Sequence, residues 1–276
     1  MRIAVTGGTG RIGGLVVRLL ADEGRHDVVP LSRRTAPYDD RAALRAALDG
    51  ADTLVFVSSD GEAARVLVHH QNVLDAAIRC GVGHVVLLSG LDADVRSPFC
   101  YAFTNGHTEQ LLRASGLPYS IVRAGLFTEF FLGLVRQVGG ADPGGPAGTV
   151  ALPAAGNRVS LVARRDVAHC LAALALRAPS NGHHDVTGPE SLTVEAIASA
   201  AGYRYADIAP GDFAGAVLRL GEEPWWTYAY ASMFESIRQG RWAAVSDAVA
   251  ELTGREPISL RDVLDGTTLS SGTGTA

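Results

Sequence analysis

The sequence contains no lysine, and all 24 of its basic residues are arginine. This absence excludes any mechanism that uses a lysine amine as a nucleophile, a base or an anchor. Acidic residues number 29, the net charge is −5, and no run of basic residues stands out. A chain without a basic run is not expected to bind nucleic acid.

Cysteine is also scarce, with three residues at Cys80, Cys100 and Cys170. Their odd number and wide spacing fit neither a disulfide framework nor a metal site, so we expect buried thiols, no metal and a reducing, cytoplasmic location. No apolar run is long enough to cross a bilayer, and the chain opens directly into a strand, so neither a membrane span nor a signal peptide is expected. The sequence does not determine the oligomeric state.

Apolar runs and helical patterns alternate through the first half of the chain. Strands are expected at 3–6, 28–31, 53–57, 84–88 and 119–122, and helices at 11–23, 40–48, 62–80 and 105–115. This alternation predicts an α/β fold with a doubly wound parallel sheet, the Rossmann architecture. Only Thr35–Asp39 separates the second strand from the next helix, so the third strand is expected to be shortened or missing. Pro30 agrees, because proline is tolerated at a sheet edge.

A glycine loop, Gly7-Gly8-Thr9-Gly10-Arg11-Ile12-Gly13, lies between the first strand and the first helix. Gly7 allows the tight turn, Gly10 lets the backbone approach a pyrophosphate, and Gly13 lets the helix pack close to the strand. The helix N-terminus then faces the phosphates with free N–H groups and a positive dipole end. We therefore expect dinucleotide binding, rather than a purely structural turn, through Gly7, Gly8, Thr9, Gly10, Arg11 and Ile12.

The end of the second strand indicates which dinucleotide binds. An NAD enzyme would carry Asp or Glu there to hold the ribose hydroxyls, whereas this chain has Ser32, Arg33 and Arg34. An arginine fork suits a 2′-phosphate, and Arg11 on the glycine loop points to the same region. We expect NADPH as the cofactor; the alternative is that these arginines are solvated surface charges.

After Arg123 the pattern changes to short strands and helices that continue to Leu264. We expect residues 1–123 to form the NADPH-binding domain and residues 124–266 to form mainly a smaller α/β substrate lobe, interleaved with the sheet. Residues 267–276 are rich in Ser, Thr and Gly and are expected to form a flexible tail.

Longer stretches carry a family pattern over nearly the whole chain. They are TGGTGRIGG, SRR, DDRAALRAALDGADTLVFVSS, NVLDAAIRCGVGHVVLLSG, LPYSIVRAGLFTEFF, VARRDVAHCLAALAL and DVTGPESLTVEAIA. Together they resemble the atypical short-chain dehydrogenase/reductases, in particular the NmrA-like group that includes NAD(P)H:quinone oxidoreductases. The resemblance is specific for the family but not for the activity, because relatives include reductases, ketone-reducing tailoring enzymes and NADP sensors that catalyse nothing.

The resemblance also implies which residues surround the nicotinamide. They follow the strands at 53–57, 84–88 and 119–122, in agreement with the rule that ligands bind outside the carboxyl ends of parallel strands. The implied residues are Val57, Ser58, Ser59, Ser89, Gly90, Gly125, Leu126 and Phe127.

The catalytic residues depart from those of the better-known members, which use Ser, Tyr and Lys with Tyr and Lys four residues apart. Here Asn105 follows Tyr101 at that spacing, and no lysine exists to rebuild the triad elsewhere. Tyr101 could still donate a proton, and Ser89 is the second candidate for stabilising a developing alkoxide. The alternative is that Tyr101 is only a wall of the pocket.

Aromatic residues gather in two segments. Of 18 in the chain, seven lie in 99–131 and seven in 213–242, the latter with all three tryptophans. Both segments are expected to border the nicotinamide pocket, where an aromatic wall suits a flat, apolar, polycyclic substrate; the alternative is an ordinary core of the small lobe. The candidate substrate-binding residues are Phe99, Tyr101, Phe127, Phe130, Phe131, Trp225 and Trp226.

The remaining candidates have simpler explanations. The adjacent pairs His69–His70 and His183–His184 point to different sides and make poor metal sites, so surface or packing roles are expected. His107 is expected on a helix surface near the cleft, and Glu129 is expected to form a structural hydrogen bond.

These features predict an NADPH-dependent reductase that transfers hydride to a carbonyl or quinone of a planar aromatic small molecule, without a Ser-Tyr-Lys triad. The excess of Arg, Ala and Gly indicates a high-GC genome and, by association, an actinomycete polyketide-tailoring ketoreductase of antibiotic biosynthesis. Two alternatives stay open: a non-catalytic NADP(H)-sensing protein, which also explains the missing lysine, and a general quinone reductase.

Arg33→Ala is expected to reduce the preference for NADPH over NADH by at least about tenfold, because a charge-assisted contact to phosphate contributes roughly 1.5–3 kcal/mol. Fluorescence titration of the variant and of the unchanged protein with both cofactors measures this preference. Equal affinity of the unchanged protein for NADPH and NADH would contradict the assignment.

Overall fold

The computed structural model describes residues 1–139 and 148–266, and its centre is a six-stranded sheet. All neighbouring strands in it are parallel, in the order β2-β1-β3-β4-β5-β9. The strands are β1 (Arg2–Val5), β2 (Asp27–Pro30), β3 (Thr53–Phe56), β4 (His84–Gly90), β5 (Tyr119–Ala124) and β9 (His183–Val186). Every residue of β3 and β4 is buried, which explains their near-continuous apolar sequences.

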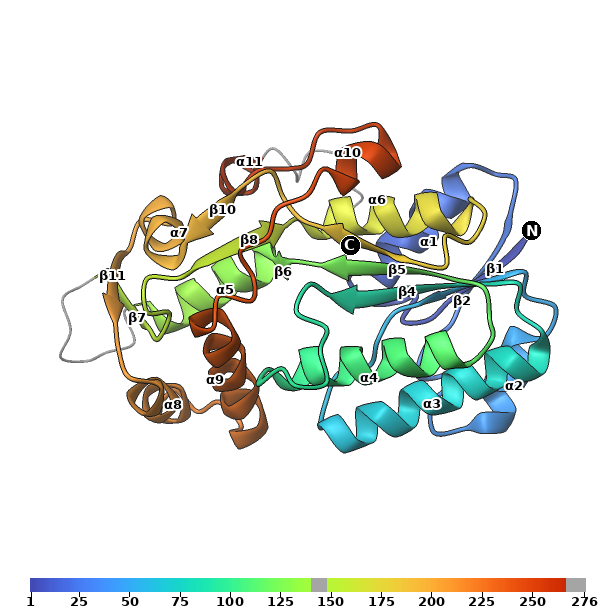
Figure 1. Cartoon of the computed structure of the whole chain (residues 1–276), viewed down its shortest axis with the longest axis horizontal. Coiled ribbons are helices and arrows are strands. Elements are labelled where there is room, and N and C mark those ends of the chain that lie inside the picture. Colours follow the sequence, from blue (N-terminus) through green and yellow to red (C-terminus); the bar gives the residue numbers. More distant parts are fainter. Residues whose placement is uncertain (140–147, 267–276) are drawn as a thin grey trace.

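Helices cover both faces of this sheet, as Figure 1 shows. One face carries α1 (Gly13–Asp22), α6 (Arg164–Ala175) and α10 (Ala248–Thr253), and the other carries α2 (Arg41–Leu48), α3 (Ala63–Cys80) and α4 (Cys100–Ala114). Each helix layer has its own apolar core, with Val16 and Leu171 buried on the first face and Leu44 and Leu112 on the second. The doubly wound α/β fold predicted from the sequence is confirmed.

The sheet ends at β2, whose residues are exposed or half-buried. Among the described residues, a tight turn rather than a strand joins β2 to α2. The Ala36 N–H donates to the Ser32 carbonyl at 2.9 Å, and the Asp40 side chain then caps the first turn of α2. The expected loss of the third strand, with Pro30 at a sheet edge, is therefore confirmed.

A smaller lobe follows β5 and packs around its own core. Its strands form a three-stranded sheet of β6 (Leu126–Phe127), β8 (Arg158–Val162) and β10 (Ser191–Thr193), and a two-stranded sheet of β7 (Thr149–Leu152) and β11 (Arg204–Asp207). Its helices are α5 (Thr128–Val138), α7 (Val194–Ala200), α8 (Pro210–Arg219), α9 (Pro224–Arg238) and α11 (Leu260–Leu264). Phe131, Phe213 and Phe234 are fully buried among these elements, so part of the aromatic enrichment serves core packing.

Parts of the second half of the chain join the large sheet. β9 pairs with β5, α6 packs against α1, and α10 packs against α6. The helix expected at 105–115 begins earlier, at Cys100, so Tyr101 lies on α4 rather than before it. The tail expected at 267–276 lies outside the described residues.

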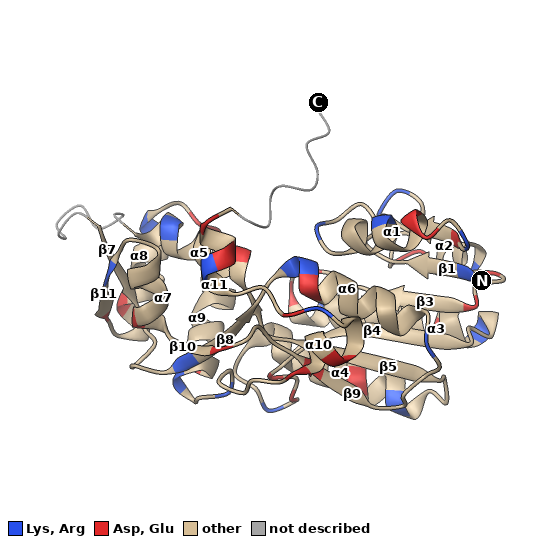
Figure 2. Ribbon diagram, turned by 90° about the horizontal axis from the view of Figure 1, so that it is seen from above, with Lys and Arg blue, Asp and Glu red and all other residues tan. Residues whose placement is uncertain are grey.

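Charged residues lie mainly on the helices and loops of both lobes, with the two signs interspersed (Figure 2). No helix within residues 1–139 and 148–266 is both long and apolar enough to cross a membrane. The same ranges hold no cluster of three or more side chains suited to binding a metal ion.

Asp166, in the first turn of α6, is a buried carboxylate that anchors the C-terminal part of the chain. It is 2% exposed and accepts the backbone N–H of Ile258 at 2.7 Å. Burial raises the pKa of this carboxyl to about 6, although the bond from Ile258 opposes the shift. The ionised form of Asp166 is therefore disfavoured in the folded chain.

This carboxyl predicts a pH-dependent stability. Because its folded pKa is raised to about 6, the stability that Asp166 contributes is complete below about pH 4 and falls as the pH rises through about 6. Asp166→Asn keeps an acceptor for Ile258 but cannot ionise. At pH 8 its free energy of unfolding should exceed that of the unchanged protein by up to about 3 kcal/mol, and the difference should vanish near pH 4. Urea unfolding at both pH values measures it, and an equal loss of stability at both would contradict the expectation.

Candidate active site

The glycine loop joins β1 to α1 and leaves the start of α1 open. Gly7 has a φ of +60°, which favours glycine, and its carbonyl accepts the Gly10 N–H at 2.7 Å. A Cβ on Gly13 would overlap the Gly7 oxygen, so only glycine lets α1 begin this close to the strand. No side chain caps the start of α1. The loop thus offers the cradle that a pyrophosphate requires. Its exposed residues are Thr9, Gly10 and Arg11, and its buried ones include Gly8 and Ile12.

The turn after β2 presents two arginines to solvent. The Thr35 hydroxyl accepts the Ser32 N–H at 3.0 Å, and the Ser32 hydroxyl accepts the Arg34 N–H at 3.3 Å. Arg33 and Arg34 are exposed, and neither forms an ion pair with a residue that the structure describes. Both guanidinium groups are therefore available to a 2′-phosphate.

Neighbouring elements hold the segment 57–59 at the end of β3. The Val57 N–H donates to the Thr6 hydroxyl at 2.8 Å, and the Tyr38 hydroxyl donates to the Val57 carbonyl at 2.8 Å. The Ser59 N–H lies 3.4 Å from Nε2 of His70, a fully buried ring whose pKa is lowered to about 3 by burial. His70 is therefore a neutral packing residue that supports the segment predicted to contact the cofactor.

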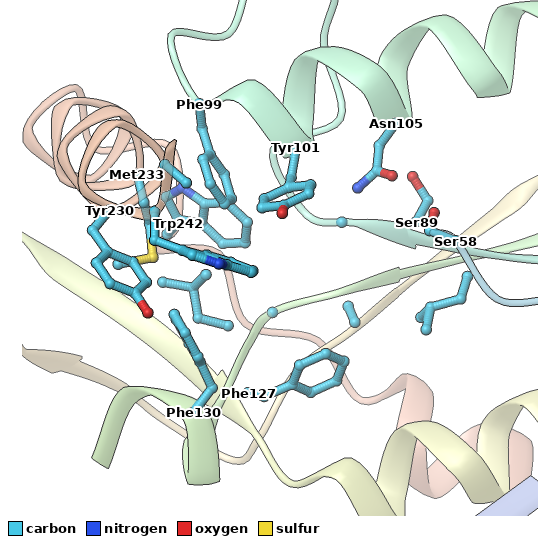
Figure 3. Close-up of a pocket in the computed structure, with 17 residues that line it drawn as sticks. Ser58, Ser89, Phe99, Tyr101, Asn105, Phe127, Phe130, Tyr230, Met233 and Trp242 are labelled. Atoms are coloured by element: carbon cyan, nitrogen blue, oxygen red, sulfur yellow. The ribbon is translucent and has the colours of Figure 1, made fainter. Parts of the chain in front are cut away.

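An apolar pocket of about 250 Å³ lies at the carboxyl ends of β4 and β5, between α4, α5 and α9 (Figure 3). Pockets at this edge of an open parallel sheet are where such folds bind ligands. The lining residues are Ser58, Leu88, Ser89, Gly90, Phe99, Tyr101, Asn105, Ala124, Gly125, Leu126, Phe127, Phe130, Trp226, Ala229, Tyr230, Met233 and Trp242.

The pocket includes most, but not all, of the residues predicted to contact nicotinamide or substrate. Phe131 is fully buried in the small-lobe core, with its ring centroid 6.2 Å from that of Phe234. Trp225 packs on Tyr228, with 5.5 Å between ring centroids, and does not line the pocket. The structure therefore contradicts the substrate-binding prediction for Phe131, whereas the same prediction for Trp225, which lies beside Tyr101 but not on the lining, stays a prediction. Adjacent residues on a helix point in different directions, so only one member of each aromatic pair, Phe130 and Trp226, faces the pocket.

Three further side chains of the pocket, Tyr230, Met233 and Trp242, are not among the candidate substrate-binding residues, although the aromatic segment 213–242 expected at the pocket contains Tyr230 and Trp242. Trp226, Tyr230 and Met233 are spaced by four and three residues on α9, so they share one face of the helix. That spacing is a signal in the sequence. Trp242 follows α9 in a loop, so only its membership of the aromatic segment, and no helical spacing, indicates that it lines the pocket.

A buried ion-pair network fixes Ser89 at the end of β4. The Ser89 hydroxyl donates to Glu109 at 2.7 Å, and Glu109 also accepts two hydrogen bonds from Arg123, at 2.6 and 2.8 Å, and one from Arg113 at 3.2 Å. Burial raises the pKa of Glu109, but the bonds from Arg123 and Ser89 outweigh it and hold that pKa below its ordinary value. Because the only hydroxyl proton of Ser89 is committed to Glu109, the structure does not support Ser89 as a donor to substrate.

Tyr101 and Asn105 lie one turn apart on α4 and face the pocket (Figure 3). The Tyr101 hydroxyl accepts the Gly61 N–H at 3.2 Å, which leaves its own proton free to donate. Burial raises the pKa of Tyr101, so the hydroxyl is protonated at neutral pH. A Cβ on Gly90 would lie 3.1 Å from Nδ2 of Asn105, so the glycine leaves room for this amide. The two side chains place two hydrogen-bond donors at the pocket.

A second buried carboxylate, Asp92, fixes the opposite wall of the pocket. It accepts the hydroxyls of Ser97 and Ser236, each at 2.5 Å, and the guanidinium of Arg241 at 3.1 Å. The Ser236 hydroxyl in turn accepts the indole N–H of Trp242 at 2.7 Å. Asp92 thereby ties α9 and Trp242 to the loop after β4.

Known proteins resemble this chain in sequence. A family described as NAD(P)H-binding matches residues 7–178. The chain is 31% identical to a (4-alkanoyl-5-oxo-2,5-dihydrofuran-3-yl)methyl phosphate reductase of Streptomyces griseus subsp. griseus, over 94% of this chain and 95% of that protein. It is 29% identical to Quinone oxidoreductase 2 of Escherichia coli, over 79% and 82%. An NmrA-like family domain-containing oxidoreductase of Aspergillus flavus is 23% identical, over 96% and 94%.

Solved structures share the fold. An NADPH-dependent quinone oxidoreductase of Escherichia coli, solved in complex with NADPH, superposes with a TM-score of 0.87 at 24% identity. The superposition covers 96% of this chain and 99% of that one, so both lobes have a counterpart.

Gly10→Ala tests whether the glycine loop holds a pyrophosphate. A Cβ at Gly10 meets only the Gly7 oxygen, at 3.1 Å, so the variant should fold, yet its methyl group stands where the backbone approaches the phosphates. We expect the NADPH dissociation constant from calorimetric titration to rise at least about tenfold. Gly133→Ala, at an exposed helical position with nothing within 4 Å of the added carbon, is the matched control and should bind normally. Unchanged affinity in Gly10→Ala would mean that the phosphates lie elsewhere.

Proposed function

Because the chain belongs to the NAD(P)H-binding family, we propose that it is an NADPH-dependent oxidoreductase that reduces a small, planar, conjugated carbonyl compound such as a quinone. The observation that carries this proposal is the aromatic-walled pocket near the glycine loop, with the donors Tyr101 and Asn105 on its lining. Relatives that are named a quinone oxidoreductase and an oxo-dihydrofuran phosphate reductase support the same chemistry.

NADPH fits the residues of the site. Family membership confirms the nicotinamide dinucleotide predicted from the glycine loop. Gly10 and the open start of α1 would hold its pyrophosphate, and Arg33 and Arg34 would hold its 2′-phosphate. When bound, the nicotinamide supplies the hydride. The likeness to a structure solved with NADPH supports this choice over NADH.

The size and lining of the pocket define the substrate class. A volume of about 250 Å³ is below the roughly 300–1,000 Å³ of typical ligand sites, and a bound nicotinamide ring would take up part of it. A small planar acceptor therefore fits better than the large polycyclic one expected from the aromatic residues alone. The rings of Phe99, Phe127, Phe130 and Trp242 offer faces and edges for stacking. If the protein is the ketone-reducing tailoring enzyme expected from the sequence, its substrate must have the same small, flat shape.

Tyr101 and Asn105 would stabilise the negative charge that hydride transfer creates. When a conjugated carbonyl accepts a hydride, its oxygen becomes anionic, and preorganised donors in a water-poor site stabilise such an oxygen strongly. The Tyr101 proton is free, and the Asn105 amide faces the same cavity. Because burial raises the pKa of Tyr101, its hydroxyl serves mainly as a hydrogen-bond donor, and the proton that completes the reduction comes from solvent.

A non-catalytic NADP(H) sensor would explain the missing lysine but not this pocket. A sensor needs a partner surface, whereas an aromatic-lined cavity with two donors suits a second small molecule. The pocket therefore supports turnover over sensing.

Consumption of NADPH in the presence of different acceptors tests the proposal. We expect turnover with a naphthoquinone and much slower turnover with a ketone or quinone of the size of a tetracyclic polyketide. Tight binding of NADPH without its oxidation by any quinone, aryl ketone or other conjugated carbonyl would overturn the enzymatic proposal and favour the sensor.

Tyr101→Phe is expected to lower kcat by about 10–100-fold, because it removes one of the two hydrogen bonds to the anionic oxygen. Since no lysine assists this tyrosine, the loss should lie at or below the lower end of the 10²–10⁴ that a positioned proton donor contributes. Asn105→Leu should have an effect of similar size, and the double variant should lose more than either. Tyr228→Phe is the control, since Tyr228 is 53% exposed and does not line the pocket. Single-turnover rates and NADPH titrations measure chemistry and binding separately. A loss above about 10⁴-fold in Tyr101→Phe alone, with unchanged NADPH affinity, would make Tyr101 the essential acid and contradict this expectation.

A further inference from the structure

Arg164, the first residue of α6, places a cation beside the pocket. Its backbone N–H donates to both carboxylate oxygens of Glu129, at 3.1 and 3.2 Å, so Glu129 caps the helix through the structural hydrogen bond expected from the sequence. The guanidinium carbon lies 5.6 Å from the centroid of the Phe127 ring, and Phe127 lines the pocket. Within the described ranges, no carboxylate lies at ion-pair distance from this guanidinium.

The charge of Arg164 is poorly compensated. Its side chain is half-buried, and burial lowers its pKa; Glu129 opposes that shift, while the nearby cation of Arg11 adds to it. Arg11 is exposed on the glycine loop and also lacks an ion-pair partner in the part of the chain that the structure describes. Two neighbouring guanidinium groups, with Glu129 as the one nearby counter-charge among the described residues that acts on Arg164, still favour an anion between them.

The packing of the helices explains why the two arginines approach each other. α1 and α6 lie side by side on one face of the sheet (Figure 1). Each precedes a strand of the parallel sheet, β2 or β9, so each begins at the carboxyl edge. Two positive helix ends and two arginines therefore gather at the edge where the glycine loop and the pocket also lie.

We propose that Arg11 and Arg164 form a clamp for the diphosphate of NADPH, with Arg164 on the nicotinamide side; this assigns Arg11 to the diphosphate and not to the 2′-phosphate region expected from the sequence. The inference rests on the proposed function, since it requires a dinucleotide on the glycine loop. Arg164 then links the two parts of the site, because its planar group stacks on Phe127 while its charge meets the phosphate. A phosphate ester on the substrate has the same chemistry, but the place of Arg11 within the glycine loop favours the diphosphate.

Titration with two ligands tests the clamp. Adenosine 2′,5′-bisphosphate has the adenosine-side phosphates of NADPH but lacks the nicotinamide-side phosphate. Arg164→Gln keeps the backbone N–H that Glu129 caps, and we expect it to weaken NADPH binding at least about tenfold while leaving the bisphosphate affinity unchanged. Arg33→Ala should weaken both ligands. Arg165→Gln, the neighbouring arginine on α6, is the matched control and should weaken neither.

Two further measurements complete the test. Arg164→Lys keeps the charge but not the planar group, so it should recover only part of the NADPH affinity. An unchanged NADPH affinity in Arg164→Gln, or an equal loss for both ligands, would overturn the clamp. Unchanged NADPH affinity with a raised KM for a phosphorylated acceptor would overturn it too and assign Arg164 to the substrate. If the unchanged protein binds neither NADPH nor the bisphosphate, the proposed function itself fails.

Discussion

The buried carboxylate of Glu109 sets the position of Tyr101 and Asn105, which line the pocket. It lies on α4, two turns after Tyr101, and its main partner, Arg123, lies on β5. Breaking a buried ion pair typically costs about 3–5 kcal/mol, and Glu109 is only 2% exposed, although Arg113 at 3.2 Å would offset part of the loss of Arg123. The ion pair therefore fixes the helix against the strand, and with it the direction in which Tyr101 and Asn105 point. Ser89 donates to the same carboxylate and is held in place rather than left free to react.

Asp92 has the equivalent role for the other wall. Through Ser236 it holds the indole of Trp242, and through Arg241 it ties the small lobe to the loop after β4. Both carboxylates lie outside the lining of the pocket. The charged groups that position the walls of the pocket therefore form ion pairs outside its lining. The cavity itself is mainly apolar, which strengthens any hydrogen bond made inside it.

Local patterns in the sequence predict the secondary structure and the fold. They do not predict which side chains face the pocket, because that depends on contacts between distant segments. The glycine loop, the alternation of strands and helices, and the short connection at Thr35–Asp39 were enough for the fold. No capping side chain marks the start of α4 at Phe99, so the sequence does not predict that the helix begins before Asn105. The sequence does not show which of two adjacent aromatic residues, such as Phe130 and Phe131, lines the pocket and which lies in the core, because this depends on the elements that pack against α5. Arg123, the one charged residue of the mostly buried strand β5, does signal a buried acid, but only the packing of α4 identifies that acid as Glu109.

The missing lysine bears on the substrate as well as on the mechanism. Hydride transfer to an isolated ketone leaves a localised, strongly basic alkoxide, which needs an efficient acid beside it. Hydride transfer to a quinone or another conjugated carbonyl leaves a delocalised anion, for which two well-placed hydrogen bonds are enough. Burial raises the pKa of Tyr101, which makes it a weak acid. Together with Asn105, one turn later on α4, it still forms a good pair of hydrogen-bond donors. The same departure from the Tyr–Lys pattern that weakens proton transfer therefore supports the proposed conjugated acceptors, whose flat shape also fits the aromatic walls.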